Sequence, residues 1–324
     1  MNFKIEKYQP QYKTQWDNFV GKAKNATFLF SRDFMEYHND RFEDFSLMVF
    51  KEEKLIAILP ANKKEDTIYS HQGLTYGGLL TESKTRLSAV IEIFKQILQF
   101  LETKNIKHFE IKIIPSIYPD FTSDELLYIL FLLRAELQRR DTLSVVDLNN
   151  ELSLSKDRKA GVKRGQKKQL NVKETDEFDS FWNEILIPNL EEKHQAKPVH
   201  SLEEITLLHK KFPKNIRQFN VYCDGKIVAG TTIFETKNVA HSQYISGNSD
   251  KNTLGSLDFL HFYLLDTVFK EKKYFDFGTS NENQGKNINQ GLSYWKETFG
   301  AHIITQDFYK IKTENHNKLA NVLI

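Results

Sequence analysis

The feature that most constrains the fold is a long-range repeat within the chain. A first stretch, between residues 47 and 115, reads "LMVFKEEKLIAILPA", "GLTYGGLL", a helical segment and "KHFEIKIIP". A second stretch, between residues 219 and 281, reads "FNVYCDGKIVAGTTIF", "SQYISGNS", a helical segment and "KYFDFGTSN". The parts follow one another in the same order and at similar spacing. This internal duplication predicts two domains with the same fold.

Each copy is expected to form a hairpin, a third strand, a helix and a closing strand. Asp224 and Gly225, between β-branched and aromatic residues, are typical of a two-residue hairpin turn. The helix of the first copy is predicted by apolar residues at the helical period, namely Leu87, Val90, Ile91, Phe94, Ile97, Leu98 and Leu101. The order strand, helix, strand favours a right-handed crossover, so the closing strands are predicted to pair in parallel.

The sequence thus predicts an α/β protein with two duplicated domains, each a mixed, mostly antiparallel sheet flanked by helices. We expect the boundary within "LSVVDLNNELSLSKDRK", which gives domains of residues 1–150 and 151–324. A chain of 324 residues with 40% apolar and 27% charged residues can support two packed cores.

Composition excludes several classes of function. The formal net charge is only +2, which gives no global attraction to nucleic acid or anionic lipid. Cys223 is the only cysteine, and no histidines have zinc-site spacing. No apolar run approaches the ~20 residues of a membrane helix, and the N-terminus lacks a secretion signal. We therefore expect a cytoplasmic protein with no stable membrane insertion and no metal.

The duplication provides an internal control, because features present in only one copy are candidates for chemistry. Glu110 and Asp276 occupy equivalent positions in the two closing strands, which favours a structural role for both. Only the second copy continues into the polar loop "GTSNENQGKNINQG". Helix capping would account for one of its amides, and the carboxyl end of a strand is where open α/β sheets bind ligands. The loop is therefore predicted to be a site.

Two other segments could bind anions. The strand-to-helix junction "QYISGNSDKNTLGSLDFL" presents the N–H groups of a helix start, but it lacks any known phosphate fingerprint. The segment "LSKDRKAGVKRGQKK" is strongly basic, and most such runs are solvated helix faces. Its two glycines weaken a helix, and it has no interleaved aromatic residues for single-stranded nucleic acid. The alternative to a solvated face is binding of an anionic small molecule or lipid headgroup.

Several motifs together resemble the tandem GNAT-fold acyltransferases. They are "KPVHSLEEI", "FPKNIRQFNVYCDGKIVAG", "HSQYISGNS", "LGSLDFL" and "YFDFGTSNENQGKNINQGLSYWKETFGA". The relatives in question are the Fem peptidoglycan aminoacyltransferases and the CelD-like proteins of envelope polysaccharide loci. The resemblance covers nearly the whole chain and is strongest from Lys197 onward. It implies two GNAT domains, with the acceptor in a groove between or beside them.

The resemblance also implies acyl transfer from a thioester or an aminoacyl ester to an amine or hydroxyl. Acyl-CoA is the implied co-substrate, with its pyrophosphate at the start of the helix after the fourth strand. That position maps to Gly247, Asn252, Gly255 and Ser256. The usual "Q/RxxGxG/A" signature is absent. The long helical hairpin often inserted in Fem aminoacyltransferases is absent too, which favours a small thioester donor.

Acyl transfer needs an uncharged nucleophile close to the carbonyl and donors for the developing oxyanion. For holding and polarising the donor we expect Tyr244, Ser280, Asn283 and Lys286, with His200 as the best proton acceptor. The phosphates of a nucleotide-linked or lipid-linked sugar would be held by Arg158, Lys163, Arg164 and Lys197. Tyr76 of the first copy either lines the acceptor groove or ends a strand.

Three functions remain open. The first is an N- or O-acyltransferase that modifies an envelope sugar or polysaccharide precursor. The second is a Fem-type aminoacyltransferase that uses aminoacyl-tRNA, in which case tRNA becomes a partner. The third is a catalytically degenerate pair of domains that serves as a binding module in envelope assembly.

Overall fold

The computed structural model describes residues 2–324, except for the side chains of residues 193 and 194. The chain forms two compact units. The first extends to Asp141 and also includes Thr305–Ile324, and the second is Thr142–Ile304. Strand β9 (Glu136–Asp147) carries the chain into the second unit and β17 (His302–Lys312) carries it back. The C-terminal segment Thr305–Ile324 therefore belongs to the same unit as the N-terminal residues. The expected boundary at residue 150 assigns this segment to the second domain.

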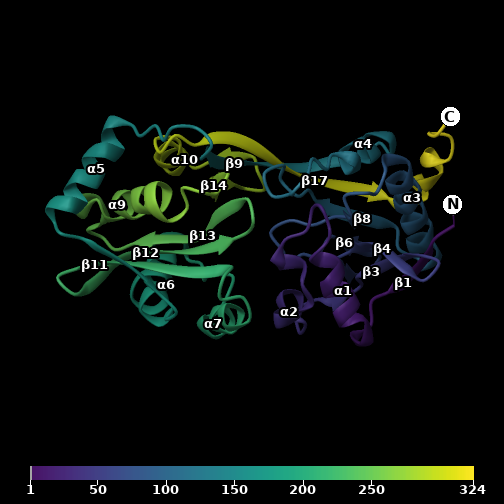
Figure 1. Cartoon of the computed structure of the whole chain (residues 1–324), viewed down its shortest axis with the longest axis horizontal. Coiled ribbons are helices and arrows are strands. Elements are labelled where there is room, and N and C mark those ends of the chain that lie inside the picture. The colour runs from purple at the N-terminus through teal and green to yellow at the C-terminus, as the bar shows by residue number, and fades with distance from the viewer. Residues whose placement is uncertain (1) are drawn as a thin grey trace. The chain divides into compact units, whose positions relative to one another are not determined.

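The first unit is drawn from purple to blue, with its C-terminal part in yellow (Figure 1). Besides parts of β9 and β17, its strands are β1 (Lys4–Lys7), β2 (Glu43–Asp44), β3 (Leu47–Lys51), β4 (Lys54–Leu59), β5 (Asn62–Lys64), β6 (Thr67–Tyr69), β7 (Leu80–Thr81) and β8 (His108–Lys112). Its α-helices are α1 (Lys13–Val20), α2 (Arg32–Met35), α3 (Leu87–Thr103) and α4 (Glu125–Leu132). Short 3₁₀ turns are η1 (Pro10–Tyr12), η2 (Phe28–Phe30), η3 (Glu36–His38) and η6 (Thr313–Leu319).

The strands of the first unit form one sheet in the order β1-β3-β4-β7 and a second series in the order β17-β8-β6-β5-β2. Strands β6 and β8 pair in parallel, from Thr67 opposite His108 to Tyr69 opposite Glu110. The predicted parallel closing strand is thus confirmed. The third strand of this copy is β6, however, and the "GLTYGGLL" stretch forms a loop whose last residue, Leu80, begins β7. Lys112 holds this loop, because its Nζ donates to the carbonyl oxygens of Gln72 and Leu74.

The predicted helix of the first copy is confirmed as α3, and its apolar side is buried in the core of the first unit. Phe109 and Ile111 of β8 pack in the same core. Ile311 and Leu319, from the returning C-terminal segment, complete it. This explains why the C-terminal segment lies in the first unit: its apolar side chains have their burial partners there.

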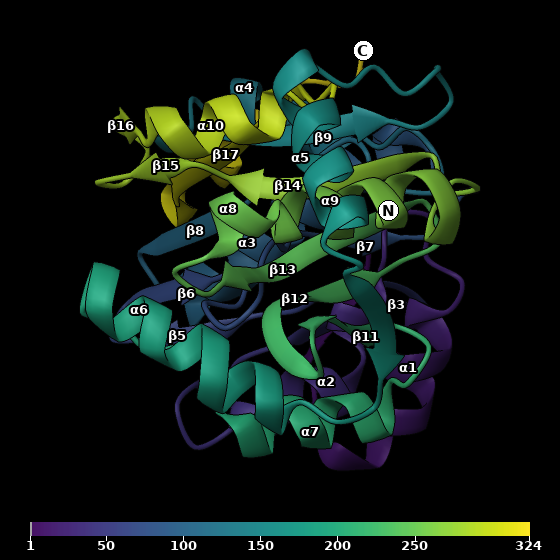
Figure 2. The ribbon, with the colours of Figure 1, turned by 90° about the vertical axis from the view of Figure 1, so that its left-hand side faces the viewer.

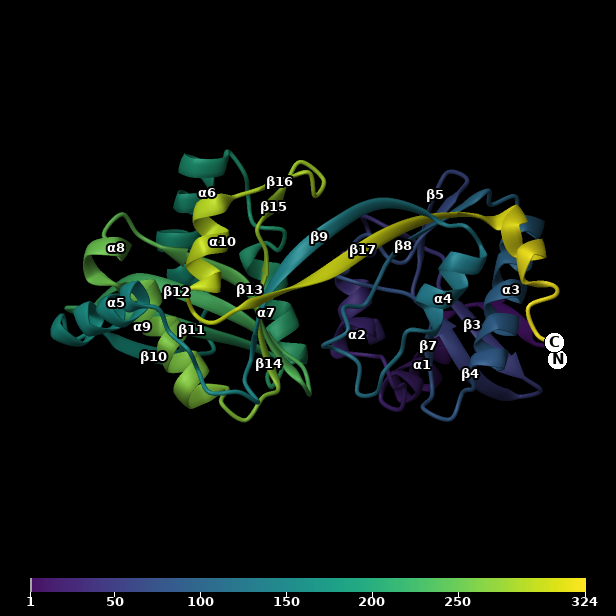
Figure 3. The ribbon, with the colours of Figure 1, turned by 90° about the horizontal axis from the view of Figure 1, so that it is seen from above.

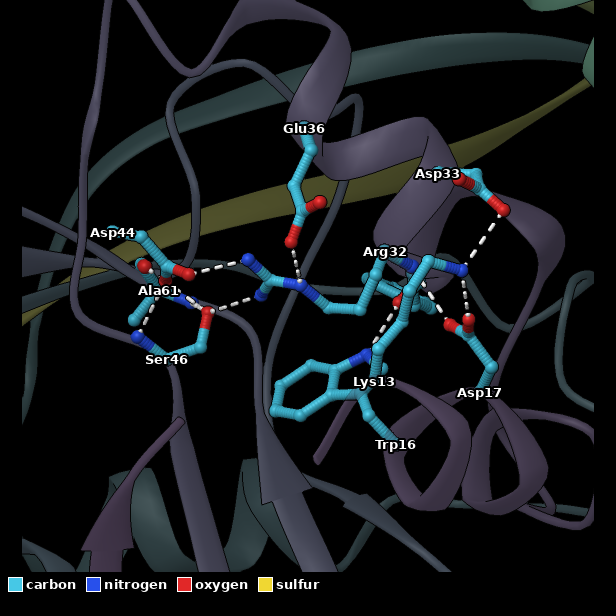
Figure 4. Close-up of polar contacts among 10 residues, drawn as sticks. Lys13, Trp16, Asp17, Arg32, Asp33, Glu36, Asp44, Ser46 and Ala61 are labelled. Atoms are coloured by element: carbon cyan, nitrogen blue, oxygen red, sulfur yellow. Dashed lines mark hydrogen bonds and ion pairs between the residues drawn. The ribbon is translucent and has the colours of Figure 1, made fainter. Parts of the chain in front are cut away.

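A buried guanidinium stabilises the N-terminal part of the first unit (Figure 4). Arg32 donates to Glu36 and Ser46 and pairs with Asp44, while its Cζ lies 3.7 Å from the ring centre of Tyr8. All three nitrogens of the guanidinium therefore have a partner, which is the condition for burying such a charge without a large penalty.

The second unit contains the remaining elements, drawn from teal to yellow in Figure 1. Besides parts of β9 and β17, its strands are β10 (Asn171–Thr175), β11 (Ile216–Cys223), β12 (Lys226–Glu235), β13 (Val239–Gly247), β14 (Tyr274–Thr279), β15 (Asn281–Glu282) and β16 (Asn287–Ile288). Its α-helices are α5 (Lys156–Lys167), α6 (Ile187–His194), α7 (Leu202–Lys211), α8 (Lys251–Leu254), α9 (Ser256–Tyr263) and α10 (Gln290–Glu297). Two π-helical turns are η4 (Phe181–Leu186) and η5 (Leu264–Val268).

The main sheet of the second unit has the strand order β10-β11-β12-β13-β14-β9. All of its pairs are antiparallel except β13 with β14. Helices α5 and α9 lie on one side of β11 to β13, and α6 and α7 lie on the other (Figures 1 and 2). Both units therefore have the predicted mixed α/β architecture with helices flanking a mostly antiparallel sheet.

Candidate active site in the second unit

Strands β13 and β14 separate at a defined point. They pair in parallel from Val239 opposite Tyr274 to His241 opposite Asp276, and the pairing ends there although both strands continue. Just beyond this point β13 contains a bulge, because Ile233 of β12 faces Ser242 while Thr232 faces Tyr244. The carboxyl ends of parallel strands are where α/β sheets bind ligands, so the His241–Asp276 pair marks a candidate site.

Asp276 orients the imidazole of His241. The Asp276 carboxylate is buried, and its Oδ2 lies 3.0 Å from His241 Nδ1 while its Oδ1 accepts from the Gly278 N–H at 2.7 Å. Since the carboxylate accepts, Nδ1 carries the proton, and neutral His241 presents Nε2 as an acceptor. Within residues 2–324, Nε2 has no hydrogen-bond partner, and the His241 side chain is 13% exposed. This is the arrangement of an oriented general base.

A glycine turn follows directly after Asp276. Gly278 has φ +70°, and a Cβ added there would lie 3.2 Å from Cε1 of His241. Glycine therefore permits both the turn and the close approach of the imidazole. Ser280 comes next and is buried, and its Oγ has no hydrogen-bond partner in the described part of the chain. An unsatisfied buried hydroxyl at the end of a strand is a group that a ligand can pair.

Lys296 of α10 brings a buried ammonium to the same turn. Its side chain is 2% exposed, and its Nζ donates to the carbonyl oxygens of Gly278 at 3.0 Å and Thr279 at 2.7 Å. Burial lowers the pKa of Lys296 to about 8, although the charge of Asp276 opposes this shift. Two carbonyls occupy two of the three N–H groups of the ammonium. The third has no acceptor among the residues described here, and it can donate to a substrate oxygen.

No pattern in the sequence predicted that His241, Asp276 and Lys296 form one group. The equivalence with Glu110 favoured a structural role for Asp276, but the environments of the two carboxylates differ. Glu110 is half-buried, with its carboxylate 3.7 Å from Lys310, whereas Asp276 is buried and paired with an imidazole. The signal in the sequence that could have pointed to this group is Lys296, which lies among the aromatic residues of "YWKETFGA". A lysine that is buried with such residues needs polar partners for its charge.

The structure brings together two of the predicted catalytic residues, His200 and Tyr244. Tyr244 Oη accepts from the His200 backbone N–H at 3.1 Å and lies 2.6 Å from His200 Nδ1. Trp182 Nε1 donates to the His200 carbonyl at 3.4 Å, and both predicted residues are buried. Because Oη accepts the amide proton, it can donate its own proton to Nδ1. These contacts tie the segment before α7 to β13.

Most amides of the polar loop build a small hairpin, β15–β16, between β14 and α10 (Figure 3). Asn281 accepts from the backbone N–H and the hydroxyl of Thr142, and it donates to Gly285. Asn283 donates to Asn287 at 2.8 Å, and Asn289 caps α10. The predicted site residues Asn283 and Lys286 are exposed on this hairpin, whereas Ser280 lies in the buried turn before it. The amide content of the loop thus has a local structural cause.

The predicted pyrophosphate position, at the start of α9, is covered. A Cβ added to Gly255 would lie 2.2 Å from the Gly161 carbonyl oxygen of α5, and Ser256 is fully buried. Asp258 places a carboxylate in the first turn, where burial raises its pKa against the opposing effects of Trp295 and Arg158. Figure 2 shows α5 lying over α9. Of the other residues predicted here, Gly247 is buried and Asn252 is exposed. A pyrophosphate would need α5 to move.

The predicted phosphate-binding cations divide into two kinds. Arg158 is mostly buried and pairs with Asp258, and Arg164 NH2 lies 3.9 Å from the same carboxylate. Lys163 is exposed on α5, and Lys197 is exposed in the segment before α7. The exposed edge of α5 opposite its packed glycines forms a lysine stripe, which consists of Lys156, Lys159, Lys163 and Lys167. Tyr76, in the first unit, is buried and donates its hydroxyl to Thr27, so it is a core residue.

Comparison with known proteins establishes the fold. No protein-family model and no curated protein matches the sequence. Among solved structures, FemX matches with a TM-score of 0.67 and 10% identity, over 94% of this chain and 96% of FemX. The C-terminal domain of a putative lysylphosphatidylglycerol synthetase from Agrobacterium fabrum matches with a TM-score of 0.61 and 11% identity, over 96% and 95%. A tandem GNAT protein of clavulanic acid biosynthesis matches with a TM-score of 0.51 and 12% identity, over 96% and 99%. The chain has a tandem GNAT-like fold.

No helix in residues 2–324 is both long and apolar enough to cross a membrane. The same part of the chain has no cluster of three or more His, Cys, Asp or Glu side chains suited to a metal ion.

Proposed function

We propose that the chain is an acyltransferase that moves an acyl group from an activated ester to an amine or hydroxyl of a cell-envelope precursor. The reaction takes place where β13 and β14 separate. The observation that carries the proposal is the combination there of His241, oriented by Asp276, with the buried ammonium of Lys296. The tandem GNAT-like fold, shared with FemX, supports this class of reaction.

Each group has a defined role in the reaction. The acceptor nitrogen or oxygen attacks the carbonyl carbon of the donor while Nε2 of His241 takes its proton. Lys296 stabilises the negative charge that develops on the carbonyl oxygen, through its charge and its remaining N–H. The bond from the carbonyl carbon to the leaving oxygen or sulfur then breaks, and His241 returns the proton to the leaving group. Asp276 keeps the imidazole in the tautomer that this sequence requires.

The donor is proposed to be an aminoacyl ester carried by tRNA, with acyl-CoA as the second candidate. The covered start of α9 supports aminoacyl-tRNA as the first candidate, because the pyrophosphate of acyl-CoA cannot reach the start of α9 while α5 is in place. The similar fold of the C-terminal domain of a putative lysylphosphatidylglycerol synthetase also supports it. Acyl-CoA remains a candidate because a tandem GNAT protein shares the fold.

The acceptor is proposed to be an envelope sugar or polysaccharide precursor linked to a nucleotide or a lipid. Its phosphates would be held by exposed cations, for which Lys163 and Lys197 are available. We propose a cytoplasmic location, where aminoacyl-tRNA and nucleotide-linked precursors both occur.

The test measures which donor is consumed. A pool of tRNA charged with labelled amino acids and a series of acyl-CoA thioesters are each incubated with the protein and a nucleotide-linked amino sugar. We expect loss of the aminoacyl ester above the spontaneous rate, with label recovered on the sugar. Thiol release from acyl-CoA instead would select the second donor. Consumption of neither donor would contradict the enzyme and favour the binding module.

A further inference from the structure

Helix α4 is apolar around its whole circumference, yet only one side of it is buried. Its sequence "ELLYILFL" contains a single charged residue, Glu125. Ile129, Leu130 and the following Leu133 face the core of the first unit and are almost completely buried. Helices that are apolar on all sides are normally covered on all sides. Packing in the first unit therefore explains the apolar residues on the inner side of α4, but not those on its outer side.

The outer side carries a row of large apolar side chains, which we call the α4 ridge: Leu127, Tyr128 and Phe131. They are 39%, 43% and 76% exposed, and their spacing makes them neighbours on one helix face. Phe121 precedes the helix and is 61% exposed, and Leu137 follows it and is 44% exposed. Figure 1 shows α4 beside α3 on the outside of the first unit. Exposed apolar side chains grouped on one helix face in this way make α4 a candidate interaction site.

The exposed area of these side chains is small for a stable protein partner. A fully exposed aromatic side chain offers about 150–250 Å², so these five residues at their exposed fractions offer roughly 500 Å² in all. Each partner in a stable protein interface contributes about 800 Å². A lipid bilayer sets no such minimum, and it needs no complementary pocket, because acyl chains adapt to a protruding ridge.

The residue types also fit a bilayer. Phenylalanine and leucine enter the acyl region, and tyrosine prefers the headgroup level. The charged groups near the ridge are Glu125 at the start of the helix, exposed Asp120 and Asp124 before it, and exposed Arg134 and Glu136 after it. Four negative charges and one positive charge give no net attraction to anionic lipid, so apolar insertion has to drive binding. The lysine stripe of α5 would behave oppositely, since its attraction to phosphates depends on salt.

We propose that the α4 ridge docks the first unit on a lipid bilayer surface by inserting Leu127, Tyr128 and Phe131 into the headgroup boundary. The docking itself does not depend on the proposed function. Its consequence for the reaction rests on the proposed function: a chain held at the bilayer would meet lipid-linked acceptors in preference to nucleotide-linked ones, while its site could still use a water-soluble acceptor.

The test is co-sedimentation of the full chain with vesicles of phosphatidylcholine, alone and mixed with phosphatidylglycerol. We expect binding to both kinds of vesicle and little loss of binding at high salt. The double variant Leu127→Ser with Phe131→Ser is expected to bind at least about tenfold more weakly, because apolar insertion is lost. The matched control is Val199→Ser with Leu207→Ser, which removes two exposed apolar side chains of the second unit and should bind like the wild type.

Two further measurements separate the outcomes. In the variant Phe131→Trp, brominated phosphatidylcholine should quench the tryptophan fluorescence more strongly than it does in the wild type. This measurement still tests the proposal if the double variant folds poorly. Sedimentation velocity tests whether a second copy of the chain, and not a bilayer, covers the α4 ridge. A dimer that the double variant abolishes, or the absence of vesicle binding by the wild type, would overturn the proposal. Transfer to a water-soluble acceptor, measured on the same variants, reports on the proposed function separately and should not change.

Discussion

At the scale of single residues, the candidate site depends on two buried charges that are held at one turn. Asp276 and Lys296 are both buried, and they share the turn Gly278–Ser280 through different atoms. Asp276 accepts the Gly278 N–H, while Lys296 donates to the Gly278 and Thr279 carbonyls. The turn is therefore fixed from both sides, which keeps His241 and the ammonium in a constant relation to each other. Preorganised groups of this kind lose little energy to rearrangement during a reaction.

The pKa of Lys296 predicts a pH-dependent stability. Burial lowers this pKa from 10.5 to about 8, so between these values the unfolded chain binds a proton that the folded chain has lost. The free energy of unfolding therefore rises with pH in this window on account of Lys296. The free energy of unfolding of the wild type, relative to that of Lys296→Met, should rise by up to about 1.4 kcal/mol per pH unit in this window. Urea unfolding of both proteins across the window measures the difference, and a constant difference would contradict the lowered pKa.

At the scale of elements, the basic segment is a helix with two different faces. By intrinsic propensity alone, its two glycines are expected to weaken a helix. In α5 they make close packing possible, because a Cβ at Gly161 would lie 1.8 Å from Asp258 Oδ2 and one at Gly165 would lie 2.6 Å from Phe259 Cβ. The opposite edge carries the lysine stripe. Intrinsic propensity alone could not reveal this, because the reason for the glycines lies on α9, far along the sequence.

Gly165→Ala should therefore destabilise the protein, although alanine favours a helix by about 1 kcal/mol over glycine. The added methyl meets the Phe259 side chain at its root, which cannot rotate away, and overpacking typically costs about 1–3 kcal/mol. Chemical denaturation should show a net loss of stability. Gln166→Ala, on the exposed side of the same helix, is the control and should have almost no effect. A more stable Gly165→Ala would show that α5 can move away from α9.

The lysine stripe should bind polyanions in a salt-dependent manner. Changing Lys159, Lys163 and Lys167 together to glutamine should lower the salt concentration at which the protein leaves a heparin column, since three exposed charges on one edge are lost. The control changes Lys210, Lys214 and Lys226, which are exposed elsewhere in the second unit and alter the net charge equally. Equal elution of the two variants would mean that the stripe is an ordinary solvated face.

At the scale of the whole molecule, the chain returns to its first unit after completing the second. The segment Thr305–Ile324 adds β17 beside β8 and places Ile311 and Leu319 in the core of the first unit. Ile311→Ala should therefore cost about 2–5 kcal/mol. Leu323→Ala changes an exposed residue of the same segment and should cost almost nothing. Thermal unfolding measures both, and equal effects would contradict the burial of the returning strand.

The repeat was sufficient to predict the architecture, since hairpin, helix and closing strand each leave a local pattern. The candidate site could not be predicted in the same way, because its groups meet only through the fold. His241 and Asp276 are neighbours through the pairing of β13 with β14, and Lys296 reaches the turn from α10. Of the predicted residues, Ser280 lies at this turn, because it belongs to the polar loop itself. The predicted residues Asn283 and Lys286 are exposed on the hairpin, where Asn283 donates to Asn287.

The most direct test of the account compares two variants of the second unit in the donor-consumption assay. His241→Gln should lower turnover by roughly 10²-fold or more, the usual contribution of a general base, with the melting temperature nearly unchanged. Asn283→Ala, which alters only an exposed hairpin contact, should retain turnover close to that of the wild type. The reverse result, an active His241→Gln and an inactive but stable Asn283→Ala, would contradict the assignment and move the chemistry to the hairpin.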